Sequence, residues 1–101
     1  MKLIYCTCNV SVLEPLLKLI DDIGVENYQV IEKLTAKNKR GDDRLNTPVW
    51  PGHNSAVIMQ IPNSQMAKNT MDKIRDFNRN AFNESELVIA CSLAMDDFCF
   101  D

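Results

Sequence analysis

The single histidine of the chain is the side chain best suited to acid–base chemistry, because imidazole titrates near neutral pH. His53 directly follows Trp50-Pro51-Gly52. Its simplest interpretation is a loop histidine without a ligand role, and the alternative is a metal ligand. Zinc or copper accepts imidazole, thiolate and carboxylate groups together. The candidate partners of His53 are therefore the tail residues Asp96, Asp97 and Cys99.

The four cysteines match no common metal or redox spacing. Cys6 and Cys8 are separated by one residue, and Cys91 and Cys99 by seven, which is neither a zinc-ribbon nor a Cys-x-x-Cys pattern. A disulfide framework is the less favoured alternative, because we find no export signal and the apolar content allows a core without covalent links. We therefore interpret the cysteines as small core residues.

Residues 38–53 form a long stretch without hydrophobic periodicity, and a loop of this length in a small domain is a functional candidate. Lys39, Arg40 and Arg44 would attract a phosphate or an acidic partner surface, although a solvated loop without a ligand is the alternative. Trp50 either anchors the loop or is presented to a partner, where tryptophan often contributes strongly to binding. The segment is therefore our candidate partner-binding loop.

Composition limits the classes of function. The chain has 101 residues, 46% of them hydrophobic, and a net charge of −3, which predicts a single domain over residues 1–101. The negative charge argues against nucleic-acid binding, and the apolar runs are too short to cross a membrane. We expect a cytoplasmic protein. No catalytic motif is recognisable, so we do not expect an enzyme.

The hydrophobic pattern alternates between strand and helix periods. Ser11 and Glu14 resemble a capping box, and Gly24 is placed to end the helix that follows. Asn63 and Ser64 are placed to start a second helix. The predicted strands are 2–9, 28–37, 55–61 and 87–94, and the predicted helices cover about 12 residues ending before Gly24 and residues 64 to about 80.

This order, βαββαβ, predicts a ferredoxin-like α+β fold. Right-handed crossovers give an antiparallel sheet of strand order 4-1-3-2 with two helices on one face. Strands one, three and four are apolar on both sides, so the uncovered face should be an oligomer interface. We further expect strand three to run in the direction of strand one, which would place residues 38–53 beside the acidic tail.

Three features together resemble the PII signalling family and its wider PII-like group: Ile23-Gly24-Val25, the strand Val30-Ile31-Glu32-Lys33 and the long loop. The resemblance covers the whole chain in layout and implies a homotrimer with its open sheet faces turned inward. It also implies a small effector bound between subunits and a long loop that docks on a membrane transporter or an enzyme. The metal-tolerance protein CutA shares the trimeric fold, and a CutA-like divalent metal-binding protein is the alternative.

Two departures from the PII pattern concern the nucleotide. Thr35-Ala36-Lys37 lacks the glycine that approaches the loop in PII proteins, and residues 80–85 lack the glycine-rich phosphate loop and its lysine. Backbone N–H groups near glycine normally cradle phosphate. An adenine nucleotide should therefore bind weakly if it is the effector, with Thr35 and Lys37 as the candidate contacts. The loop also lacks the tyrosine that PII proteins modify.

Overall fold

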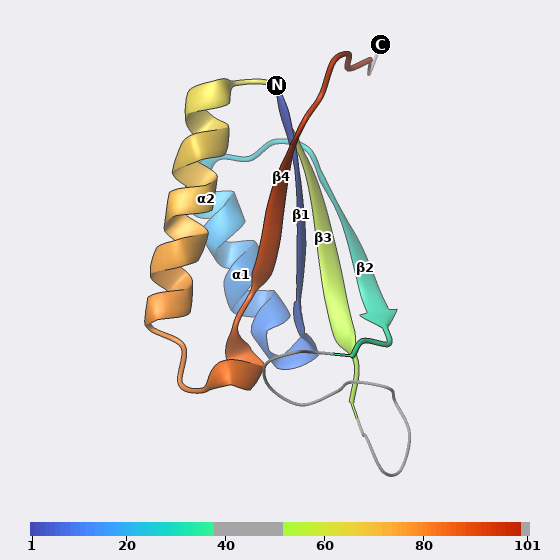
Figure 1. Cartoon of the computed structure of the whole chain (residues 1–101), viewed down its shortest axis with the longest axis vertical. Helices are drawn as coiled ribbons and strands as arrows, with labels where there is room; N and C mark the ends of the chain where they lie inside the picture. Colours follow the sequence, from blue (N-terminus) through green and yellow to red (C-terminus); the bar gives the residue numbers. More distant parts are fainter. Residues whose placement is uncertain (38–51, 100–101) are drawn as a thin grey trace.

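Four strands form one sheet in the computed structural model, which describes residues 1–37 and 52–99. The strands are β1 (Lys2–Asn9), β2 (Tyr28–Leu34), β3 (Asn54–Ile61) and β4 (Ile89–Ala94), and each pair of neighbours is antiparallel. Their spatial order is β2-β3-β1-β4, which is the predicted order 4-1-3-2 read from the opposite edge. The helices α1 (Val10–Ile23) and α2 (Ser64–Arg79) both cover one face (Figure 1). The predicted ferredoxin-like fold is confirmed.

The central strand β1 organises the core. Its residues alternate between buried and half-buried positions, and Ile4, Cys6 and Cys8 point toward the helices and are almost fully buried. In register, Cys6 lies opposite Val57 of β3 and Ala90 of β4. From the helices, the core receives the buried side chains Val12, Leu16, Ile20, Ala67 and Ile74. Burial of this apolar surface is the main force that holds the helices on the sheet.

The helix ends follow local capping. Asn9, rather than the predicted Ser11, caps α1, because its side-chain oxygen accepts from the backbone N–H of Ser11 at 3.2 Å. The helix therefore begins one residue before Ser11, and Pro15 lies beyond the first turn. Gly24 ends the helix with a positive φ of 96°, a conformation that favours glycine. Asn63 caps α2 as predicted, accepting from the N–H of Met66 at 2.9 Å.

Two strands are shorter than predicted. β2 ends at Leu34 instead of residue 37, because its register with β3 shifts between Ile31 and Leu34. β4 begins at Ile89 instead of residue 87, since a short 3-10 turn, η1 (Glu84–Glu86), precedes it. In both cases the apolar pattern continues past the point where the hydrogen-bonded ladder ends. None of the helices in the described part of the chain is long and apolar enough to cross a membrane.

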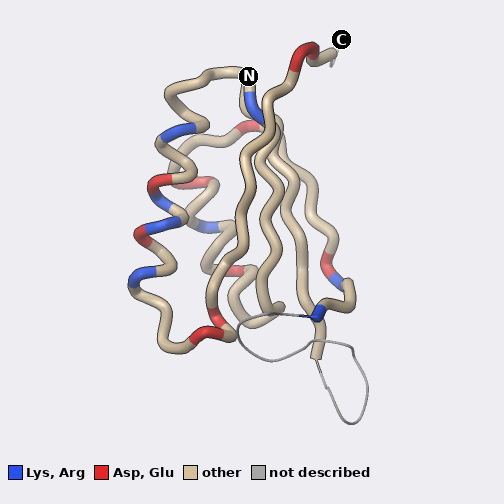
Figure 2. Tube along the Cα trace, viewed as in Figure 1, with Lys and Arg blue, Asp and Glu red and all other residues tan. Residues whose placement is uncertain are grey.

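The face of the sheet away from the helices, here called the open face, carries no charged side chain among the residues paired in register. Charged residues are concentrated instead on the helices and near the strand ends (Figure 2). Ile31, Ile89 and Leu93 are 45%, 60% and 49% exposed on this face. Its members in the register are Leu3, Tyr5, Thr7, Gln29, Ile31, Ala56, Ile58, Gln60, Ile89, Cys91 and Leu93. A monomer would thus leave a large apolar surface in water.

The Asn78 side chain joins the end of α2 to the approach to β4. Its Nδ2 donates to the carbonyl of Val88 at 2.9 Å, and its Oδ1 accepts from the Val88 N–H at 2.8 Å. Because Val88 is only 3% exposed, Asn78→Ala would leave two buried backbone groups unpaired. We expect a loss of about 2 kcal/mol in the free energy of unfolding, measured by urea denaturation.

The matched control is Asn69→Ala, at an exposed position of the same helix. This variant should be neutral or slightly more stable, because alanine has the higher helix propensity. An equal loss of stability in both variants would show that the Val88 contact is not the cause.

Candidate functional site

The base of segment 38–53 lies where β2 ends and β3 begins. Leu34 is paired with Asn54 across these strands, so the residues just after Leu34 lie near the start of β3. Thr35 and Lys37, the predicted effector contacts, are both exposed there. The predicted partner-binding residues Lys39, Arg40, Arg44 and Trp50 lie outside the described residues. The described part of this site therefore consists of the two ends that flank the segment.

Asn54 is the unusual residue at this base. It is 3% exposed, and its Oδ1 has no hydrogen-bond partner among the residues that the structure describes. A buried acceptor left unpaired costs about 1–3 kcal/mol. A donor brought by a ligand or another chain would remove that cost. The sequence analysis missed Asn54, because an asparagine before an apolar run is equally typical of an ordinary turn.

His53 is tied to the start of α1, since its carbonyl accepts from the Val10 N–H at 3.2 Å. This links the end of segment 38–53 to the helix layer. The imidazole belongs to a half-buried residue. His53 is thus at the end of the sheet where β1 stops.

The predicted convergence of His53 with the tail is wrong. β3 is antiparallel to β1, not parallel, so the start of β3 lies opposite Asn9 while the end of β4 lies opposite Lys2. The length of β1, about 24 Å at the usual rise per residue, separates these positions. Asp96, Asp97 and Cys99 follow β4 and lie near the N-terminus instead, where the Met95 N–H donates to the Met1 carbonyl.

One chain therefore does not assemble the predicted metal site. In residues 1–37 and 52–99, no group of three or more potential metal ligands occurs.

The cysteines divide into two pairs. Burial raises the pKa of Cys6 to about 12 and that of Cys8 to about 11, which keeps both thiols protonated and unreactive. For these two the prediction of core residues is confirmed. It is wrong for Cys91 and Cys99, which are exposed, because β4 is an edge strand and the tail extends beyond it.

Comparison with solved structures identifies the fold. CPII, a nitrogen regulatory PII-like protein from Thiomonas intermedia K12, matches in its complex with ADP, AMP and bicarbonate at a TM-score of 0.65 and 15% identity. This match covers 97% of the present chain and 94% of CPII. CPII bound to ADP and bicarbonate gives a TM-score of 0.67 at 16% identity, with 91% and 84% of the chains covered.

A protein of Thermus thermophilus described as PII-like and signalling matches at a TM-score of 0.62 and 15% identity, covering 91% of this chain and 83% of that one. No protein-family model and no curated protein sequence matches the chain. At these identities the likeness concerns the fold. The chain has the fold of the PII-like signalling proteins.

The raised thiol pKa values predict selective alkylation. In native protein at about pH 8, iodoacetamide should modify Cys99 and leave Cys6 and Cys8 intact, as read by peptide mass spectrometry, whereas denatured protein should lose all its thiols. Because burial favours the protonated thiols, its contribution to stability is complete below the ordinary thiol pKa of 9.0 and is lost as pH rises toward 12. Equal labelling of Cys6 and Cys99 in native protein would contradict this assignment.

Proposed function

We propose that the chain is a PII-like regulatory protein, a cytoplasmic homotrimer that senses a small effector between its subunits and has no catalytic role. The observation that carries the proposal is the uncharged open face of a sheet with the PII-like fold. Exposed Ile31, Ile89 and Leu93 lie on two different strands of that face. Burying such a surface is favourable by about 25 cal/mol per Å².

Identical copies of the chain fit this face because it offers no charge to specify a different partner. Its polar groups include Gln60 and Gln29, and these already bond to each other through Nε2 and Oε1 at 2.8 Å. The apolar side chains of neighbouring copies can therefore pack on it without leaving charges unpaired. With the open faces inward, α1 and α2 and their charged side chains remain on the outside of the trimer.

The effector site is proposed at the base of segment 38–53. Lys37 supplies a positive charge for a phosphate, Thr35 supplies a hydroxyl, and Asn54 supplies a buried acceptor that needs a donor. The structures of CPII with ADP support an adenine nucleotide as the class of effector, since its amino and hydroxyl groups are donors. Because the glycines of a backbone phosphate cradle are missing, we expect weak binding.

The output of the trimer is proposed to run through segment 38–53. Its cations Lys39, Arg40 and Arg44 and its single tryptophan, Trp50, would contact an acidic surface of a partner, for which a membrane transporter is our candidate. The segment starts and ends at the effector site, so a ligand that contacts Thr35 or Asn54 would act on both of its ends. This arrangement couples effector binding to partner binding.

Sedimentation equilibrium tests the assembly. The wild-type chain should show three times its mass of 11.5 kDa, and Leu93→Glu should give a folded monomer, because the new carboxylate would be buried without a partner at the interface. Val10→Glu is the control, since Val10 is 38% exposed but lies at the start of α1, away from the open face. A monomeric wild type, or a Leu93→Glu variant that stays trimeric, would refute the proposed assembly.

Calorimetric titration with ADP tests the effector site. Wild-type protein should bind weakly, and Lys37→Ala should weaken binding about tenfold through loss of a charge-assisted contact to phosphate. Lys73→Ala removes an exposed lysine of α2 and should leave the affinity unchanged. Micromolar or tighter binding that is insensitive to Lys37→Ala would show that the phosphates bind elsewhere.

A further inference from the structure

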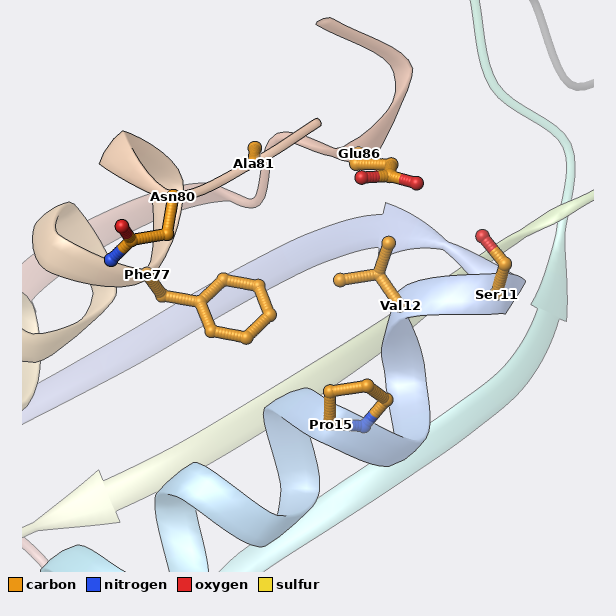
Figure 3. A pocket seen from close by; sticks show the side chains of 7 residues that line it. All are labelled: Ser11, Val12, Pro15, Phe77, Asn80, Ala81 and Glu86. Carbon is orange, nitrogen blue, oxygen red and sulfur yellow. The ribbon is translucent and has the colours of Figure 1, made fainter. Parts of the chain in front are cut away.

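A second pocket lies in the helix layer, between the start of α1, the end of α2 and η1. Its volume is about 260 Å³. The apolar part of its wall consists of Val12, Pro15, Phe77 and Ala81, and its polar part includes the Ser11 hydroxyl and the Glu86 carboxylate. Figure 3 shows the ring of Phe77 pointing from α2 toward Val12 and Pro15 on α1, with Glu86 and Ser11 on the side toward η1. The pocket faces away from the open face.

The apolar part matches a small hydrophobic group. Val12 is buried and Phe77 is half-buried against the core, so this wall is held in place by packing. A cavity of about 150 Å³ lined by apolar side chains suffices for benzene. The pocket therefore has room for a six-membered ring and a short substituent.

The polar part carries a fixed negative charge. The Oε2 of Glu86 accepts from the backbone N–H of Phe82 at 3.0 Å, which orients the carboxylate at the edge of the pocket. No lysine or arginine lines the pocket, and none of the ion pairs found among the described residues includes Glu86. The second carboxylate oxygen therefore has no cationic partner in this part of the molecule.

The nearby start of α1 explains why a carboxylate is stable there and why the pocket should reject anions. The N-terminus of a helix carries a partial positive charge, and α1 has no acidic residue in its own first turn. Glu86 supplies that negative charge from η1. An anionic ligand in the same pocket would meet the Glu86 carboxylate and be repelled, whereas a cation would be attracted to it.

We propose that this pocket binds a small organic cation, an ammonium group carried on an apolar or aromatic body of about the size of a benzyl group. The ammonium pairs with Glu86, and the body packs against Phe77, Val12 and Pro15. All of these residues belong to one chain. The proposal is therefore independent of the trimer and of the nucleotide site.

The test uses benzylammonium as the probe, titrated into the full-length protein and followed by amide chemical shifts. We expect saturable binding with shifts centred on residues 11–15 and 77–86. Benzyl alcohol should bind at least about tenfold more weakly, and phenylacetate more weakly still. Equal or tighter binding of phenylacetate would overturn the proposal, as would the absence of saturation with benzylammonium up to about 10 mM.

Two variants separate the charge from the cavity. Glu86→Gln keeps an oxygen that can accept from the Phe82 N–H and should weaken benzylammonium binding about tenfold, while leaving benzyl alcohol unaffected. Ala81→Leu should abolish binding of both probes by filling the pocket. Unchanged benzylammonium affinity in Glu86→Gln would overturn the proposal even if Ala81→Leu does not fold.

Phe82→Ala is the control for non-specific adsorption. Phe82 is 92% exposed and so is the most obvious apolar contact on the nearby surface, yet its side chain does not line the pocket. The variant retains the backbone N–H that holds Glu86. Its affinity for benzylammonium should equal that of the wild type, and a tenfold loss would place the probe on the exposed ring instead.

Discussion

Strand β1 is hydrogen-bonded along both edges, to β3 on one side and to β4 on the other. This pairing runs from Lys2 opposite Ile61 to Asn9 opposite Asn54. The register decides which side chains face the helices and which face outward, because a shift by one residue would exchange the two faces. It also decides that the base of segment 38–53 lies at one end of the sheet and the tail at the other.

The two faces created by this register have different needs. On one face Ile4, Cys6 and Cys8 are covered by α1 and α2, and burial keeps the thiols protonated. The open face carries Ile31, Ile89 and Leu93 without a cover within the chain. Stability of a single chain therefore comes from the helix side, and the open face is the surface from which an assembly would gain most. The helix side also holds the Glu86 pocket, so the two proposed ligand sites are built from different layers.

Much of the fold could be predicted because its signals are local. The alternation of Ile4, Cys6 and Cys8 with Leu3 and Tyr5 identifies β1 and its two faces, and Gly24 marks the end of α1 because its positive φ disfavours other residues. Strand order then followed from the handedness of the two crossovers.

The errors concern features without a local signal. The direction of β3 relative to β1 depends on the whole path of the chain, and mistaking it placed His53 beside Cys99. Asn9 and Ser11 are both good helix caps, so only the backbone path decides between them. The buried Oδ1 of Asn54 and the carboxylate of Glu86 became candidates for sites only through their surroundings.

The central claim, that copies of the chain cover the open face, is tested most directly at Cys91. This residue is exposed in a single chain and lies opposite Tyr5 on that face, whereas exposed Cys99 lies in the tail. In native wild-type protein, iodoacetamide should modify Cys99 much faster than Cys91, and Leu93→Glu should make Cys91 reactive. Rapid modification of Cys91 in the wild type, at the rate of Cys99, would contradict the account.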